Sequence, residues 1–111
     1  MKLEVNQADK YSVITIKGRI DTISAVEFDG VGQNVMKTEN KSIIMDCTDL
    51  EYITSSGLRV FLVLQKSMQS KKGRIVFCGF QPGIKEIFDI SGFSGIFQIY
   101  PDLNTAIESC S

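Results

Sequence analysis

"DLEYITSSGLRVFLVLQK", residues 49–66, is the stretch that decides the fold, because a strand-like segment passes here into a strongly apolar run. Between the two lie Thr54, Ser55 and Ser56, followed by Gly57. One hydroxyl side chain before a helix is enough to accept a hydrogen bond from an unpaired backbone amide, and it is worth about 1 kcal/mol relative to alanine. Three consecutive hydroxyl residues exceed that need. The stretch is therefore a candidate functional site as well as a helix start.

The composition is that of an ordinary globular protein. Of the 111 residues, 43% are hydrophobic and 23% are charged, and the net charge is −1, so we expect one domain over residues 1–111. Nucleic-acid binding is not expected, because it requires clustered Lys and Arg side chains. Charges within residues 1–10 exclude a secretory signal, and the longest apolar run, residues 60–64, is too short for a membrane span. We expect a cytoplasmic protein without direct membrane insertion.

Three cysteines and the absence of histidine limit the chemistry of the chain. Cys47, Cys78 and Cys110 are far apart and form no Cys-x-x-Cys pair, so we expect small buried side chains in a reducing compartment. The chain contains no histidine, which argues against a metal site. We expect no cofactor.

Alternating and continuous apolar patterns predict five strands. Residues 2–6 and 11–17 alternate across a polar turn and are typical of a β-hairpin. Residues 42–47 form a short continuous apolar run, as expected of a strand buried on both faces. Two further strands are predicted at residues 74–79 and 96–100.

The stretch over residues 21–37 predicts a helix with a marked start at Ser24. Ser24 and Glu27 have the spacing of a capping box, in which each side chain bonds the other residue's backbone amide, and Ile23 and Phe28 are placed for the accompanying apolar contact. Gly30 and Gly32 weaken this helix. Its predicted apolar face consists of Phe28, Val31, Val35 and Met36.

Three more helices complete the pattern: one from about Ser56 to Ser70 with Gly73 as its C-terminal cap, a short one beginning at Pro82 and stopped by Gly92, and one within residues 102–111. The predicted order is β-β-α-β-α-β-α-β-α. We expect an α/β fold with a mixed, mostly parallel sheet, an N-terminal hairpin and about four helices. Loops at the carboxyl ends of parallel strands form the functional rim of such sheets, and the hydroxyl cluster lies there.

Several interpretations of the hydroxyl cluster stay open on the residues alone. Capping of the helix is the simplest. A nucleophilic serine needs a base, and the absence of histidine excludes the ordinary triad, while neither Ser-x-x-Lys nor Gly-x-Ser-x-Gly is present. "TSSG" is too short for a nucleotide-binding loop and no lysine follows it. A serine phosphorylated by another protein also fits, because the start of a helix tolerates about two negative charges.

The helix behind the cluster has two faces. Leu58, Phe61, Leu62 and Met68 can face the sheet, whereas Arg59, Val63 and Lys66 share another face with Val60 at its edge. The second face is either additional packing or a half-apolar, positively charged docking surface. The candidate partner-binding residues are Leu58, Arg59, Val63 and Lys66.

The sequence resembles the STAS domain of bacterial anti-sigma factor antagonists. "DLEYITSSGLRVFLVLQK" is similar to the family signature, in which a strand and a short loop lead to a serine, a second small residue, Gly-Leu and a helix. "VITIKGRIDTISAVEF" is similar to the second strand, the Gly-x-(Ile/Leu)-Asp turn and the first helix, and "GRIVFCGFQPGIKEIFDISGF" to the later strand, the Pro-containing turn and the Phe-x-x-(Ser/Thr)-Gly-(Phe/Leu) ending. The resemblance covers essentially the whole chain.

The resemblance implies a binding protein without catalytic power. Unphosphorylated members bind an anti-sigma factor that is also a serine kinase, and so release a sigma factor; the kinase phosphorylates them, the complex separates, and a serine phosphatase restores binding. By motif position the phosphoacceptor falls on Ser55, with Ser56 and Gly57 beside it, and Asp21 matches the family's loop aspartate. Many members carry Asp immediately before the acceptor, where this chain has Thr54, so Thr54 is a second candidate acceptor.

Two other functions remain as alternatives. The first is a stand-alone STAS accessory subunit of a membrane transporter complex, docking on its ATPase and catalysing nothing. The second is a small-ligand or nucleotide sensor that uses the same rim. In each case we expect a monomer when the protein is free.

Overall fold

A computed structural model describes residues 1–110 and contains a six-stranded sheet with helices on both faces. In chain order the elements are β1 (Lys2–Gln7), β2 (Ser12–Ile20), α1 (Thr22–Met36), β3 (Ser42–Asp46), β4 (Leu50–Ile53), α2 (Ser55–Ser70), β5 (Arg74–Cys78), α3 (Pro82–Ile90), the 3-10 turn η1 (Phe93–Gly95), β6 (Gln98–Tyr100) and α4 (Leu103–Ser109). The fold class is the one that the sequence predicts.

The sheet has the strand order β1-β2-β3-β5-β6, and β4 pairs with the far end of β2. β1 and β2 are antiparallel, which confirms the hairpin, and every other pair is parallel. β3 lies beside Ser12–Thr15 of β2, and β4 lies beside Gly18–Ile20, after a register shift at Gly18. The predicted order of elements omits β4, although the segment reads as strand-like. The omission has a physical reason, since β4 has four residues and two of them are exposed.

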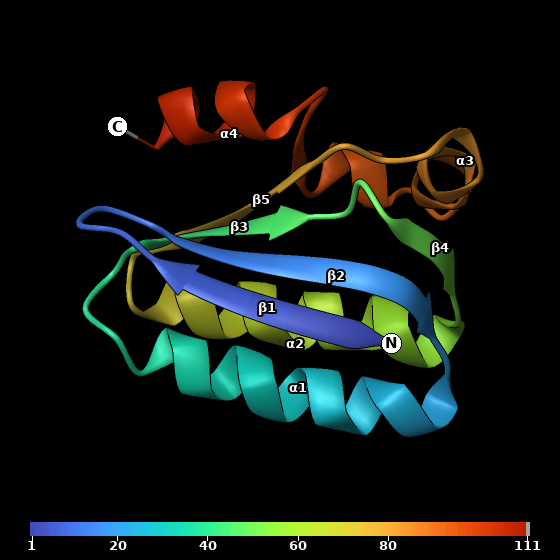
Figure 1. The fold of residues 1–111 in the computed structure, drawn as a ribbon, viewed down its shortest axis with the longest axis horizontal. Helices are drawn as coiled ribbons and strands as arrows, with labels where there is room; N and C mark the ends of the chain where they lie inside the picture. The colour runs from blue at the N-terminus through green and yellow to red at the C-terminus, as the bar shows by residue number, and fades with distance from the viewer. Residues whose placement is uncertain (111) are drawn as a thin grey trace.

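The helices cover the sheet unequally (Figure 1). α1 and α2 lie side by side on one face, α4 lies on the other, and α3 sits at the end of the sheet near β4. The main core joins α1, α2 and α3 to the sheet and contains Phe28, Phe61, Phe77 and Phe88, all fully buried. A smaller core under α4 contains Val13, Ile44, Val76, Cys78 and Ala106. Because both faces are covered, β3 and β5 are apolar along almost their whole length.

The start of α1 differs from the prediction. Asp21 is the N-cap, because its Oδ1 atom accepts a hydrogen bond from the backbone amide of Ser24 at 2.8 Å, and the Ser24 hydroxyl accepts one from the amide of Asp21 at 2.8 Å. Ser24 is thus the inner member of the capping box, and Glu27 has no part in it. Ile23 is 85% exposed, so the predicted contact with Phe28 is absent. Aspartate caps a helix as well as serine does, and it stands three residues earlier in the chain.

The predicted inner face of α1 is confirmed, since Phe28, Val35 and Met36 are buried and Val31 packs against the main core. The C-terminal cap of α2 is a correction. Lys72, and not Gly73, adopts the left-handed conformation, with φ of 60°. The amide of Lys72 donates to the carbonyl of Gln69 at 3.0 Å, and that of Gly73 to the carbonyl of Met68 at 2.7 Å, which is a Schellman ending. Glycine is needed at 73 for a different reason: a Cβ there would lie 2.7 Å from the carbonyl oxygen of Lys41.

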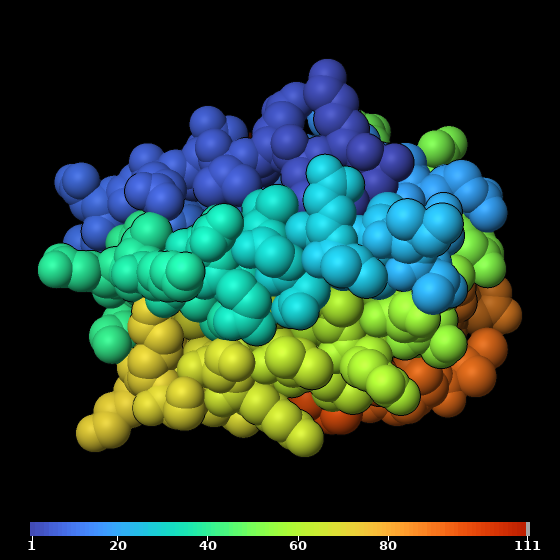
Figure 2. Space-filling view, turned by 90° about the horizontal axis from the view of Figure 1, so that it is seen from below, coloured from blue at the N-terminus to red at the C-terminus, as the bar shows by residue number. Residues whose placement is uncertain are grey.

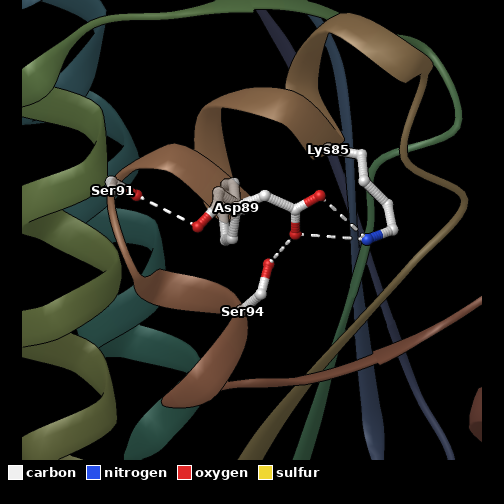
Figure 3. Close-up of polar contacts among 5 residues, drawn as sticks. Lys85, Asp89, Ser91 and Ser94 are labelled. Atoms are coloured by element: carbon white, nitrogen blue, oxygen red, sulfur yellow. Dashed lines mark hydrogen bonds and ion pairs between the residues drawn. The ribbon is translucent and has the colours of Figure 1, made fainter.

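The predicted limits of α3 are confirmed. Pro82 occupies the first turn, and Gly92, with φ of 81°, follows the last one. Figure 3 shows the polar contacts that tie η1 to this helix: Asp89 accepts hydrogen bonds from Lys85 at 3.2 and 3.3 Å and from the hydroxyl of Ser94. The hydroxyl of Ser94 and the ammonium of Lys85 lower the pKa of Asp89. The exposed cluster therefore fastens a turn and requires no functional explanation.

Candidate functional site

The three hydroxyl residues lie where α2 begins, at the carboxyl ends of β2 and β4. The amide of Thr54 donates to the carbonyl of Ile20 at 3.0 Å, which joins this start to the end of β2. Thr54 is the N-cap, and its Oγ1 atom accepts from the amide of Gly57 at 3.4 Å. The helix therefore begins at Ser55, one residue earlier than predicted.

Gly57 seats the first turn of α2 against the strand ends. A Cβ at this position would lie 2.7 Å from Cγ1 of Ile53 and 2.8 Å from Cγ2 of Ile20, and both isoleucines are buried. Such separations are shorter than packed carbon atoms adopt. Glycine thus permits an approach between helix and sheet that any other residue would prevent, and this approach determines where Ser55 lies.

Ser55 and Ser56 differ from Thr54 in what their hydroxyls do. Ser55 is exposed and Ser56 half-buried, and within residues 1–110 neither hydroxyl makes a hydrogen bond. Their backbone amides, in the first turn of α2, also lack an acceptor in the part of the chain described. The site accordingly combines free hydroxyls, unpaired amides and the positive end of a helix dipole, a combination suited to negative charge.

A groove runs from these serines between α1 and α2, on the face shown in Figure 2, where the two helices lie next to each other. Its volume is about 430 Å³. The two charged residues that line it are Asp29 of α1 and Arg59 of α2. The complete lining is Thr22, Ala25, Val26, Asp29, Ser55, Ser56, Arg59 and Val60.

Sequence reasoning missed the part that α1 plays in this groove. Val26 lines the groove and is 76% exposed, and Ile23, outside the groove lining, is 85% exposed, so the first turns of α1 present aliphatic side chains to solvent. Ile23 and Val26 are apolar residues three apart, which could have indicated an apolar side at the start of the helix. With the N-cap predicted at Ser24, however, Ile23 fell outside the helix and was expected to pack against Phe28.

Asp21 is engaged within its own loop. Its carboxylate accepts from the amide and the hydroxyl of Ser24, at 2.8 and 2.9 Å, and these hydrogen bonds lower the pKa of Asp21. Asp21 is not among the residues lining the groove. The backbone that leads into Asp21 nevertheless lies at the start of α2, because the amide of Thr54 donates a hydrogen bond to the carbonyl of Ile20, the residue before Asp21.

The outer face of α2 carries three of the four predicted partner-binding residues. Arg59 and Lys66 are exposed, and Val63 is 42% exposed. Leu58 lies elsewhere: it is half-buried and packs against the main core. Val60, expected at the edge of this face, is 9% exposed and lines the groove. The helical period places Leu58 and Arg59 on adjoining but different sides of α2.

Cys47 and Cys78 are fully buried, as predicted, and Cys110 is half-buried. Burial raises the pKa of Cys78 to about 12, with smaller contributions from nearby aspartates, and raises the pKa of Cys47 well above its usual value. Thiols in such surroundings are poor nucleophiles. Within residues 1–110, no group of three or more Cys, Asp or Glu side chains is placed to hold a metal ion.

Comparison with known proteins identifies the family. Residues 2–106 match the STAS domain. BtrV of Bordetella bronchiseptica, a protein assigned as an anti-sigma factor antagonist, is 32% identical over 100 residues, which cover 89% of this chain and 85% of that protein. The chain therefore belongs to the STAS domain family.

Solved structures agree on the fold. A crystal structure of an anti-sigma factor antagonist from Mycobacterium paratuberculosis matches with a TM-score of 0.90 at 20% identity, covering 98% of this chain and 92% of that one. SpoIIAA, an anti-sigma factor antagonist, matches at 17% identity in its unphosphorylated form (TM-score 0.83, 97% and 95% covered) and in the phosphorylated form from Bacillus (TM-score 0.77, 99% and 100% covered). No helix within residues 1–110 has the length and apolar character needed to cross a membrane.

Proposed function

We propose that this protein is a cytoplasmic anti-sigma factor antagonist switched by phosphorylation of Ser55. The unphosphorylated form binds an anti-sigma factor with serine kinase activity and thereby frees a sigma factor, and a serine phosphatase reverses the modification. The observation that carries the proposal is the exposed Ser55 hydroxyl, free of hydrogen bonds within the described residues, in the first turn of α2. The protein supplies no catalytic group. Support comes from the curated relative assigned to this class and from SpoIIAA, which is known in both states.

The same geometry favours Ser55 over its neighbours as the acceptor. Thr54 already uses its hydroxyl as the helix cap, and Ser56 is half-buried in the groove. In the reaction, the Ser55 oxygen attacks the γ-phosphorus of ATP, the bond from that phosphorus to the β,γ-bridging oxygen breaks, ADP leaves, and the hydroxyl proton passes to a base of the kinase.

The docking surface of the proposal consists of the rim around Ser55, the groove, and the outer face of α2 with Arg59, Val63 and Lys66. Apolar area for contact comes from Val26 and Val63, and the positive charges favour an acidic partner surface. A phosphate on Ser55 would bring about two negative charges to the edge of this surface. Like charges facing each other in an interface cost several kcal/mol, and each 1.4 kcal/mol is about tenfold in affinity, so we expect binding to weaken about 100-fold or more.

The test begins with incubation of the protein with ATP and a candidate anti-sigma factor kinase, followed by mass spectrometry. We expect one phosphate on Ser55, none on Ser55→Ala, and unchanged modification of the matched control Ser56→Ala. In a binding titration, Ser55→Ala should bind as the parent does, and Ser55→Asp should bind more weakly, although Asp carries less charge than phosphate.

Two results would contradict the proposal. One is modification of Thr54 or Ser56 with Ser55 left untouched. The other is tight binding of the phosphorylated protein to the kinase. Co-purification with a permease–ATPase complex, and with no anti-sigma factor, would replace the proposal by a transporter function.

A further inference from the structure

Arg59 brings an unpaired positive charge to the groove that begins at Ser55. It is exposed and lines the groove, and within residues 1–110 it takes part in no ion pair. The other charged lining residue is Asp29, which accepts a hydrogen bond from Gln33 at 3.3 Å. The groove thus contains a cation that nothing in the described fold uses.

The helix geometry directs this cation toward Ser55. Residues four apart on a helix are neighbours, with Cβ atoms about 5–6 Å apart, and Ser55 and Arg59 have that spacing within α2. Long helical side chains lean toward the helix N-terminus and cover the preceding turn. An anionic residue that precedes a cationic one by four positions is also the more favourable order. Both residues line the same groove, so the space between them is open.

We propose that Arg59 is the counter-ion of phosphorylated Ser55, and that its guanidinium and the free amides of the first turn of α2 hold the phosphate at the mouth of the groove. The guanidinium provides paired N–H donors that match two oxygens of a phosphate. The amides of Ser55 and Ser56 have no acceptor in the described residues and face the same end of the helix. This inference takes its biological use from the proposed function, but the contact itself does not depend on which kinase adds the phosphate.

The contact would change the surface in two ways at once. The phosphate adds negative charge at the rim, and pairing with Arg59 withdraws from the partner a cation that the unphosphorylated surface offers. Lys66, on the same outer face of α2 but outside the groove lining, keeps its charge. The modified surface therefore loses the free positive charge of Arg59 at the groove, while that of Lys66 remains.

The carboxylates near the site set the conditions for the test. Asp29 faces the groove from α1 and opposes a phosphate there. Asp21 is occupied by Ser24 at the start of α1. Hydrogen bonds from Ser24 lower the pKa of Asp21, so Asp21 stays ionised near pH 6, where a phosphoserine loses its second proton.

The experiment installs phosphoserine at position 55 of the full chain during translation and follows the phosphorus resonance by NMR from pH 4.5 to 8. A nearby guanidinium favours the doubly charged phosphate. We therefore expect the second pKa of phosphoserine in the parent to lie below that in Arg59→Gln by about 0.3 unit or more. Arg59→Lys should restore part of the difference, and Lys66→Gln, the matched control with one cation fewer on the same helix, should leave the pKa unchanged.

The inference is overturned if the parent and Arg59→Gln titrate with the same phosphate pKa, or if Lys66→Gln moves that pKa as much as Arg59→Gln does. The first result would mean that only the backbone amides bind the phosphate. The second would mean that any nearby positive charge lowers the phosphate pKa, with no specific contact to Arg59. Phosphoserine is installed without a kinase, so these results do not depend on the proposed function. The proposed function fails separately, if the candidate kinase does not modify Ser55.

Discussion

Replacement of Gly57 by alanine should destabilise the protein, although alanine normally favours a helix. A Cβ at Gly57 meets Cγ1 of Ile53 at 2.7 Å and Cγ2 of Ile20 at 2.8 Å. Both contact carbons are bonded directly to a Cβ atom and belong to buried, β-branched side chains, which have few alternative rotamers. Relief of the overlap therefore requires that the start of α2 move away from the strand ends.

The magnitude follows from a comparison with Gly30. Gly30 lies inside α1, is exposed, and a Cβ there meets nothing within 4 Å, so Gly30→Ala should stabilise the protein by up to about 1 kcal/mol. Gly57→Ala has at most the same gain in helix propensity, but it adds an overpacking cost of about 1–3 kcal/mol. The difference between the two variants isolates the steric cost, and Gly57→Ala should be the less stable by about 1–3 kcal/mol.

Urea denaturation monitored by far-UV circular dichroism measures this difference, and thermal unfolding provides a second estimate, since about 1 kcal/mol corresponds to about 4 °C for a domain near this size. The m-values of parent and variants should agree, which shows that the folded state is retained. Equal free energies of unfolding for Gly57→Ala and Gly30→Ala would refute the argument that close contact with Ile20 and Ile53 positions the start of α2.

Three further predictions concern other parts of the fold. Hydrogen bonds in the capping box lower the pKa of Asp21. The ionised Asp21 carboxylate therefore stabilises the fold above the ordinary carboxyl pKa, and this stabilisation is lost as the pH falls through the pKa of Asp21 in the folded protein. Asp21→Asn should consequently lose less stability than the parent between pH 5 and pH 2.5, as measured by urea denaturation. Lys72→Gly should raise the free energy of unfolding by up to about 1 kcal/mol in the same assay, because φ at Lys72 is 60°. At pH 8, an alkylating reagent should modify Cys110 before Cys47 and Cys78 in the native protein, as peptide mass spectrometry would show, because burial raises the pKa of both inner thiols.

Elements with a strong local signal were predictable from the sequence. β3 and β5 are continuous apolar segments because helices cover both sides of the sheet. Pro82 and Gly92 delimit α3 through backbone properties of their own, namely a fixed φ and a left-handed φ. In such cases local chemistry and tertiary structure agree, and a single sequence is sufficient.

Elements that depend on distant partners were not predictable in the same way. The β4 segment reads as strand-like in the sequence, but its place in the sheet depends on pairing with Gly18–Ile20 of β2, beyond a register shift. Asp21 and Ser24 are both suitable N-cap residues for α1. Asp21 is the N-cap in the structure, because the helix starts directly after β2. The groove exists only because α1 and α2 lie side by side, so Asp29 cannot be associated with Arg59 from their positions in the chain.

The arrangement at the start of α2 explains why one hydroxyl would not have sufficed. Thr54 gives its hydroxyl to the cap, and Gly57 gives up a side chain so that the first turn can approach Ile20 and Ile53. The residues on either side of the two serines therefore stabilise the helix start. The hydroxyls of Ser55 and Ser56 make no hydrogen bond within the described residues. Because Ser55 contributes little to the stability of the fold, a charged group attached to its hydroxyl changes what the surface presents to a partner while the helix start stays in place. Separation of the residues that hold the helix from the residue that we propose is modified is the property that a reversible binding switch requires.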